Sequence, residues 1–460
     1  MTRIGLNIAC FLVLISAGAL SAQTVTTTTL EARSLKFETE GFSIRVQTYV
    51  QFRLTIQEEV GQRGRGGSNG RDFRNFRVAR AKLEFQGHIY DPAFQYQVRL
   101  NFARPASEMI EVAQLRWAFH QFLNVSGGQA AVRWNWEEQV DALNLNFQER
   151  SYANEVFNQD YGKGVWLDGQ FGTDVPWVKY WFGIYNGVLA AQDDFRNKDG
   201  ALTSDSFSTL IDNELMFNTR VETHPFGLMD YGLGDRRSED EHDQLLLAFG
   251  AGANLLFSRV DNADLRNDSG ATTTGSGRPR VSQETLAVTL DGHFRWYGIA
   301  VDVAVYWRTT QFHNKGINAF DNSNKRGIGD LEDSGWTFEA SYYIHLIDLN
   351  VAFRVSSVDA DEFWGADAAL SQTDLQQRAI RPDAMEYGFN ASYLLQGERL
   401  KFSLDIVYID QQLAYSYKGG PYLSGVYNDP QTRNGLLGQS RANADHDVLW
   451  IVRFQVQWIF

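Results

Sequence analysis

The sequence predicts an all-β fold, a sixteen-stranded antiparallel transmembrane β-barrel. Many segments of about ten residues alternate between apolar and polar side chains, as strands do when one face meets lipid and the other meets water. The connections between these segments alternate between short and long, as in outer-membrane barrels. No segment after residue 22 reaches the roughly 18 consecutive apolar residues of a membrane helix.

The last predicted strand, residues 448–460, shows the alternation most clearly. One register is wholly apolar, whereas the other holds Arg453, Gln455 and Gln457. The apolar register is rich in Trp and Phe, whose rings suit a lipid face and its interfaces. Its end, with Trp458 and Phe460, resembles the signal by which the outer-membrane assembly machinery recognises barrel proteins. An edge strand of a soluble sandwich is the alternative, but the same pattern recurs many times upstream.

The N-terminal residues 1–22 have the features of a cleaved signal peptide, namely Arg3, a short apolar run and the small pair Ser21-Ala22. Residues 23–41 are polar and are predicted to lie in the periplasm, and residues 42–460 are predicted to form the barrel. The only cysteine is Cys10, within the signal, so no disulfide is predicted in the mature chain. These features predict a location in the outer membrane of a Gram-negative-type bacterium.

Sixteen strands are counted from the alternation, and the sixth to eighth alternate less clearly, which leaves the count open by two. An even count places both chain termini on the periplasmic side. Two connections break the alternation of lengths, because 103–108 is a short outer loop and 225–243 is a long periplasmic one. Short turns are predicted near residues 91, 124, 174, 297, 347 and 397, and long outer loops near 58–72, 136–160, 187–210, 260–280, 313–332, 359–383 and 411–444.

Sixteen strands leave a water-filled lumen, and its chemistry depends on which charges face inward. The inward register of the first four strands carries six cations against a single carboxylate, Glu84. We call these six cations the basic wall and predict that they line the channel and set its ion preference. Ordinary polarity of a wet face, with incidental charge sign, is the alternative. The basic wall consists of Arg45, Arg53, Arg80, Lys82, Arg99 and Arg116, and Arg133 is a further candidate.

No motif for catalysis or for a cofactor stands out in the sequence. There is no Gly-rich phosphate loop, no His/Cys metal cluster and no G-x-S-x-G elbow. We therefore predict a channel without enzymatic activity, cofactor, bound metal or nucleic-acid partner. A barrel adhesin or enzyme, with its activity in the outer loops, is the alternative from a different class.

Several segments together resemble the phosphate-selective porin family, porins O and P. The resemblance covers most of the mature chain and implies a sixteen-stranded trimeric porin whose third loop folds inward. The segments that carry it are the Arg-rich 76–87 (FRVARAKLEFQG), Gly128-Gln129, the acidic pair Glu137-Glu138, 147–151 (FQERS), and Gly335-Trp336 with 349–359 (LNVAFRVSSVD).

The segment after Gly128-Gln129 departs from the family pattern. The family usually has an aromatic residue, a Lys and a Pro-Phe pair there, whereas this chain reads Ala130-Ala131-Val132-Arg133-Trp134. We therefore predict passive diffusion of small hydrophilic solutes and ions with weak ion selectivity. A phosphate- or polyphosphate-selective channel is the alternative. The predicted partners are outer-membrane lipid, small anions or hydrophilic solutes, the barrel assembly machinery and further copies of the chain in a homotrimer.

The predicted loop 136–160 follows the fifth strand, where the resemblance implies a loop that folds into the barrel. It carries six carboxylates against one cation. An acidic loop opposite the basic wall would set a transverse field across the constriction, which orients dipolar solutes. A solvated surface loop is the alternative. The candidate constriction residues are Glu137, Glu138, Asp141, Glu149 and Arg150.

Overall fold

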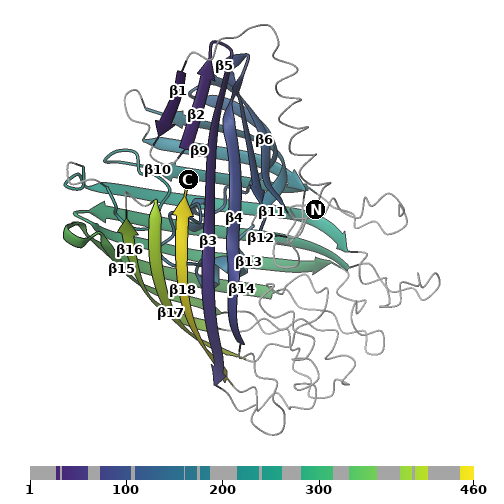
Figure 1. The fold of residues 1–460 in the computed structure, drawn as a ribbon. Coiled ribbons are helices and arrows are strands. Elements are labelled where there is room, and N and C mark those ends of the chain that lie inside the picture. The colour runs from purple at the N-terminus through teal and green to yellow at the C-terminus, as the bar shows by residue number, and fades with distance from the viewer. Residues whose placement is uncertain are drawn as a thin grey trace, which may run out of the picture.

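In the computed structural model, sixteen antiparallel strands, β3 to β18, form a closed barrel (Figure 1). Each strand pairs with the next along the chain, and β18 pairs back onto β3, with Val448 opposite Val60 and Ile459 opposite Tyr49. Closure lets neighbouring strands satisfy each other's backbone groups within lipid. The predicted fold class and strand count are confirmed.

The strands differ in length, and the longest lie where the chain enters the ring. Their bounds are β3 (Phe42–Val60), β4 (Phe73–Ile89), β5 (Asp91–Asn101), β6 (Ile110–His120), β7 (Leu123–Ala131), β8 (Tyr161–Phe171), β9 (Val178–Asn186), β10 (Leu215–Thr223), β11 (Leu246–Asp261), β12 (Val281–Trp296), β13 (Ile299–His313), β14 (Leu331–Ile344), β15 (Leu349–Asp359), β16 (Ala384–Leu395), β17 (Leu400–Gln412) and β18 (His446–Ile459).

The structure describes most of the wall and two of the connections that fold toward it. The predicted signal peptide and most of the predicted long outer loops lie outside the described residues. Among the described residues, no helix is both long and apolar enough to cross a membrane. The described residues are 27–31, 34–60, 73–104, 109–159, 161–172, 177–186, 215–237, 241–261, 281–313, 331–359, 384–395, 399–412 and 446–460.

Two short strands precede the barrel within the predicted polar lead-in. β1 (Thr27–Glu31) pairs with β2 (Ser34–Thr39), and β2 pairs with β3 from Phe42 to Val46. β18 pairs with the same edge of β3 only from Tyr49 onward. The hairpin therefore extends the wall at the end where the last strand stops, which the polar composition did not predict.

Burial follows the predicted alternation along each strand. On β12, Leu286 and Leu290 are almost half exposed, whereas Thr289 and Asp291 in the other register are buried. The outward row is apolar, as a lipid-facing row must be, because charges there cost up to a few kcal/mol near the membrane midplane. The inward row is polar.

A β-bulge in β4 changes the predicted register of that strand. Gln51 of β3 faces Arg80, but the next residue, Phe52, faces Val78, so Ala79 is left unpaired. The predicted inward positions from Arg80 onward are correct. On the N-terminal side of the bulge, the inward-facing positions are shifted by one residue, so that Arg77 faces the inward Arg53. Alternation within one strand cannot locate such a shift.

Tight turns close the short connections. Tyr90, Tyr297 and Asp348 have positive φ angles of 67°, 49° and 52°, which are uncommon for residues with a side chain and mark sharp reversals. These positions agree with the turns predicted near 91, 297 and 347. The turn predicted near 124 lies at 121–122, because β7 already begins at Leu123.

Candidate pore constriction

Residues 132–159, which we call the inner segment, connect β7 to β8 and contact strands on a distant part of the ring. The backbone N–H of Gln148 donates to Asp405 of β17 at 2.8 Å. The backbone N–H of Ala153 donates to Ser356 of β15, also at 2.8 Å. Both acceptors belong to the inward register, so these bonds form on the lumen side of the wall.

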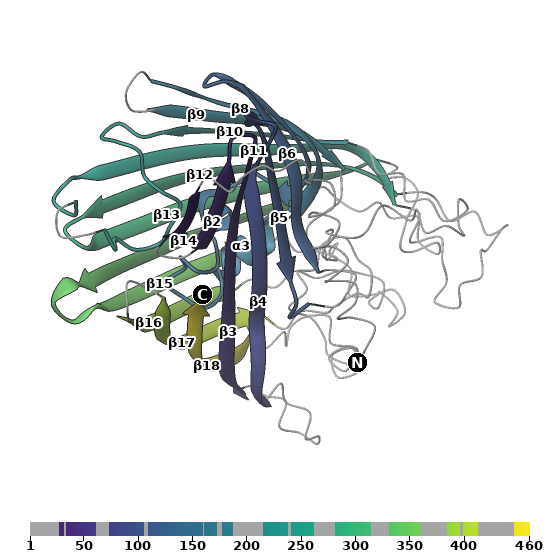
Figure 2. The same ribbon diagram turned by 45° about the horizontal axis from the view of Figure 1, so that its top comes forward.

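Two short helices shape the inner segment. α2 (Trp136–Gln139) is capped by Asn135 and α3 (Tyr152–Phe157) by Ser151, each side chain accepting a backbone N–H of its helix. Figure 2 shows α3 among the strands of the wall. The Glu137 carboxylate accepts from the Ser151 N–H at 2.6 Å and from its hydroxyl at 2.7 Å. Burial raises the pKa of Glu137. Glu137 therefore links the two helices.

Arg150 and Glu138 also form bonds within the inner segment. The Arg150 guanidinium donates to the carbonyl oxygens of Glu137, Glu138 and Val140 at 3.1–3.3 Å. Its Nε lies 3.6 Å from the Glu138 carboxylate, which also accepts from Asn154 at 3.2 Å. These bonds fold the segment on itself.

Large aromatic side chains fix the inner segment to the strands. Trp134, Phe147 and Phe157 are at most 2% exposed. A Cβ atom added at Gly388 of β16 would lie 2.7 Å from Cε1 of Phe147, and one added at Gly335 of β14 would lie 2.6 Å from Cε2 of Phe157. Inward glycines therefore leave the room that these rings occupy.

The long connection between β10 and β11 also packs on the inner segment. We call its residues 224–237 the periplasmic segment. The Leu233 N–H donates to the Asn144 carbonyl oxygen at 3.1 Å, and the Trp136 indole donates to the Gly232 carbonyl oxygen at 3.4 Å. The connection that was predicted to be unusually long for the periplasmic side, 225–243, thus contains a second structured element. This element packs against the inner segment and supports it.

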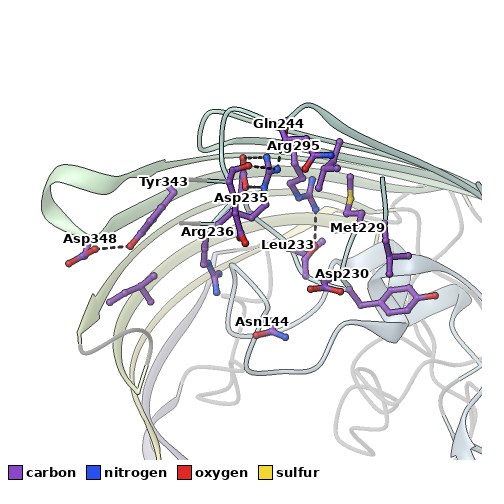
Figure 3. Close-up of a pocket in the computed structure, with 18 residues that line it drawn as sticks. Asn144, Met229, Asp230, Leu233, Asp235, Arg236, Gln244, Arg295, Tyr343 and Asp348 are labelled. Atoms are coloured by element: carbon purple, nitrogen blue, oxygen red, sulfur yellow. Dashed lines mark hydrogen bonds and ion pairs between the residues drawn. The ribbon is translucent and has the colours of Figure 1, made fainter. Parts of the chain in front are cut away.

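A cavity of about 630 Å³ opens beside the periplasmic segment (Figure 3). Asp230, Arg236, Arg295 and Asp348 line it, so both charge signs are present. Arg295 also donates to the Gly232 carbonyl oxygen at 2.8 Å, which ties the segment to β12. We call this cavity the vestibule.

A second cavity, of about 180 Å³, lies between the inner segment and the wall of β4 to β8. We call it the constriction. Glutamine side chains, short apolar side chains and Tyr161 complete its lining. Its charged lining residues are the cations Arg80, Lys82, Arg99, Arg104, Arg133 and Arg150 and the carboxylates Glu111, Glu138 and Asp141.

The structure brings together three of the six basic-wall residues at the constriction, Arg80, Lys82 and Arg99. Arg53 is fully buried, where it binds Glu149 and the Gln455 side chain. Among the remaining two, Arg116 pairs with Asp168 at 2.6 Å, and Arg45 lies on β3 opposite Gln86. Neither lines the constriction. Arg133 does line it, at the start of the inner segment.

Carboxylates partner each basic-wall residue in the constriction. Nζ of Lys82 lies 2.6 Å from Glu111, and Nη2 of Arg80 lies 2.7 Å from Glu149. Nη2 of Arg99 lies 2.9 Å from Asp141. Two of these three carboxylates, Asp141 and Glu149, belong to the inner segment, so opposite charges meet in direct ion pairs.

The surrounding cations keep these two inner-segment acids ionised. Burial alone would raise both pKa values, but Arg99 and Lys82 hold the pKa of Asp141 below its usual range. Arg53 and Arg80 likewise hold the pKa of Glu149 well below its usual range.

Glu111 is a constriction residue that the sequence did not predict. Strict alternation from Gln114 places Glu111 in the outward row. A register shift between β5 and β6 pairs Arg99 with Val112 and Leu100 with Ile110, so Glu111 turns inward and is buried. The inward position of Lys82 could have pointed to Glu111, because a buried lysine needs a carboxylate partner nearby.

A sequence model of the family described as phosphate-selective porin O and P matches residues 50–205. The match covers β4 to β9, the inner segment and all of the basic wall except Arg45. Together with the closed ring of sixteen strands, it identifies an outer-membrane porin. A search of curated proteins gave no match.

Solved structures similar to this porin include several outer-membrane channels. The channel DcaP of Acinetobacter baumannii has a TM-score of 0.49 and 10% identity, over 90% of this chain and 97% of that one. The anion-selective porin from Comamonas acidovorans has a TM-score of 0.48 and 9% identity, over 91% of this chain and 100% of that one. The barrel assignment itself rests on the strand pairings above.

Among the described residues, no group of three or more His, Cys, Asp or Glu side chains could hold a metal ion.

Proposed function

We propose that the porin forms an off-centre, water-filled channel for passive diffusion of small hydrophilic solutes and ions, narrowed by the inner segment. One observation carries this proposal. The inner segment covers the inward row on the side of β11 to β18 and leaves a cavity of about 180 Å³ on the side of β4 to β8. Solutes would pass this constriction and leave through the vestibule.

The charges of the constriction favour weak anion preference. Its lining holds six cations against three carboxylates, but most of the cations are paired. A paired cation attracts a passing anion less than a free one, because the carboxylate cancels much of its field. The paired charges therefore form local dipoles along the wall, and the predicted electric field across the constriction is weak.

Selectivity for phosphate or polyphosphate is the second candidate, and the family match of residues 50–205 favours it. A dehydrated phosphate needs several charge-assisted donors at once. Arg80, Lys82 and Arg99 already donate to carboxylates in this structure. General diffusion is therefore the better-supported function.

The exposed end of the C-terminal strand is what supports a proposed role in assembly and membrane insertion. Trp458 and Phe460 are 59% and 62% exposed in the outward row, where lipid would contact them. The Phe460 N–H donates to the Thr48 carbonyl oxygen at 3.1 Å, so the last residue is tied to β3. We propose recognition of this strand by the barrel assembly machinery and a homotrimer in the outer membrane.

Single-channel recording in planar bilayers tests the proposal. We expect a steady open conductance, a reversal potential in a KCl gradient that indicates weak anion preference, and little change on adding phosphate. The absence of any steady open state would favour an adhesin or barrel enzyme. A conductance that phosphate blocks at micromolar concentration would favour the second candidate.

A further inference from the structure

Two cations, Arg133 and Lys179, lie against the aromatic ring of Tyr231, where the constriction and the vestibule come close. The Arg133 guanidinium carbon lies 5.8 Å from the ring centroid of Tyr231 and 5.6 Å from that of Trp181. Nζ of Lys179 lies 5.5 Å from the Tyr231 centroid. The three elements that supply them, the inner segment, β9 and the periplasmic segment, are far apart in the sequence.

The aromatic ring is held in place by a buried network. The Tyr231 hydroxyl donates to the Glu222 carboxylate at 2.7 Å. Glu222 is paired with Arg220 at 2.6 Å, and both are buried. Glu222 also lies 3.6 Å from Nε2 of His224, so it already has three partners. Tyr231 therefore presents a fixed ring to Arg133 and Lys179.

The two cations differ from the basic-wall residues of the constriction. Within the described part of the chain, neither Arg133 nor Lys179 forms an ion pair, and Arg133 has one side-chain hydrogen bond, to Gln139 at 2.5 Å. Stacking on a ring leaves the edge of a guanidinium available to donate to an oxyanion. Both side chains are partly exposed.

Their position joins the two cavities. Arg133 lines the constriction, and Tyr231 lines the vestibule. An anion that leaves the constriction toward the vestibule would therefore pass Arg133 and the Tyr231 ring, against which Lys179 also lies.

We propose that Arg133 and Lys179 form an oxyanion relay site, walled by Trp181 and Tyr231, that binds small oxyanions as they leave the constriction. The inference rests on the proposed channel and adds a binding site to it. The ligand is a planar or tetrahedral oxyanion that accepts from the Arg133 edge. The ring edges carry partial positive charge and add contact area, which favours an organic carboxylate over inorganic phosphate.

Block of the chloride current in planar bilayers tests the relay site. Benzoate represents the organic carboxylates, and inorganic phosphate represents the other source of the same chemistry. In the full-length porin, Arg133→Gln and Lys179→Gln should each raise the half-blocking concentration of benzoate by about tenfold, which corresponds to roughly 1.4 kcal/mol. Heat-modifiable gel migration checks that each variant is folded.

Arg74→Gln is the matched control. Arg74 is in the outward row opposite Ile56, and its side chain is 77% exposed. It should leave the block unchanged.

The outcomes separate the relay site from the channel itself. Equal block of wild type and both variants, with conductance intact, overturns the relay site and leaves the channel standing. No open state in the wild type overturns the channel. A larger loss of benzoate block supports organic carboxylates as ligands, whereas a larger loss of phosphate block supports the site with inorganic phosphate as its ligand.

Discussion

The two sides of the barrel obey the same alternation but use their inward rows differently. On the side of β11 to β18, Thr289, Asn390 and Asp405 have no exposed surface. On the side of β4 to β6, Gln97 and Gln114 are only partly buried and line the constriction. One side therefore anchors the inner segment, and the other leaves a path.

Side-chain size explains much of this difference. The anchoring side carries inward glycines at positions where aromatic rings or backbone of the inner segment approach, such as Gly252, Gly335 and Gly388. The open side carries long charged and amide side chains, such as Arg99, that keep a neighbouring backbone at a distance. The size of the inward side chains thus decides which side of the lumen the inner segment fills, although the inward side chains are polar on both sides.

The largest effect should come from removing the inner segment. Deleting residues 137–149 removes most of α2 and the Phe147 anchor, so the anchoring side should open to solvent and resemble the other side. We expect a several-fold rise in single-channel conductance, because conductance follows the open cross-section. An unchanged conductance in a folded variant would show that this segment does not narrow the path.

A single methyl group should loosen the anchoring side. Gly252→Ala places a Cβ against the carbonyl oxygen of Trp134, a backbone atom that cannot rotate away. Overpacking of this kind costs about 1–3 kcal/mol, so the inner segment should undock part of the time and the open current should become noisy. Gly127→Ala is the control, since its Cβ would lie 3.7 Å from its nearest neighbours. Equally quiet recordings from both variants would contradict the proposed anchoring.

Acid should weaken the contact between the inner segment and β3 and β4. The pKa of Glu149 is well below the usual value near 4.3, so its ion pairs stabilise the docked segment fully above that pH. The stabilisation is lost as pH falls through the lowered pKa of the folded state. Conductance noise should therefore increase only below about pH 4. Glu149→Gln should show the noise already at neutral pH, and a flat response in wild type would exclude this role.

The sequence predicted the strands of the barrel wall better than it predicted the contacts inside the lumen. The alternation of apolar and polar residues correctly placed Arg80, Lys82 and Arg99 in the inward row. However, this pattern contains information about one strand at a time. It could not locate the bulge at Ala79 or the register shift at Glu111, because both depend on the partner strand.

The family resemblance implied that this loop folds inward, and its composition showed that it is acidic, but neither indicated which residues it would pair with. Six carboxylates near a basic wall suggest a long-range field. The structure instead pairs Asp141 and Glu149 directly with basic-wall cations and uses Glu137 as a link between helices. Such pairings depend on distances across the ring, which no local pattern contains.

The smallest effect should come from changing charge on the open side without changing its shape. Arg80→Gln with Lys82→Gln removes Lys82, which lies 2.6 Å from Glu111, so the constriction loses two cations and keeps all of its carboxylates. The anion preference should fall by roughly twofold, and the reversal potential should move toward that of cations. The shift should be larger at 0.01 M than at 1 M salt, where the Debye length is about 3 Å.

Arg116→Gln provides the comparison for this double variant. Arg116 belongs to the basic wall but lies outside the constriction, where it pairs with Asp168. It should shift the reversal potential far less than the double variant does. Equal shifts would show that the whole basic wall sets the ion preference through its summed field. A shift confined to the double variant would show that the preference is set only where the inner segment brings the two sides of the barrel together.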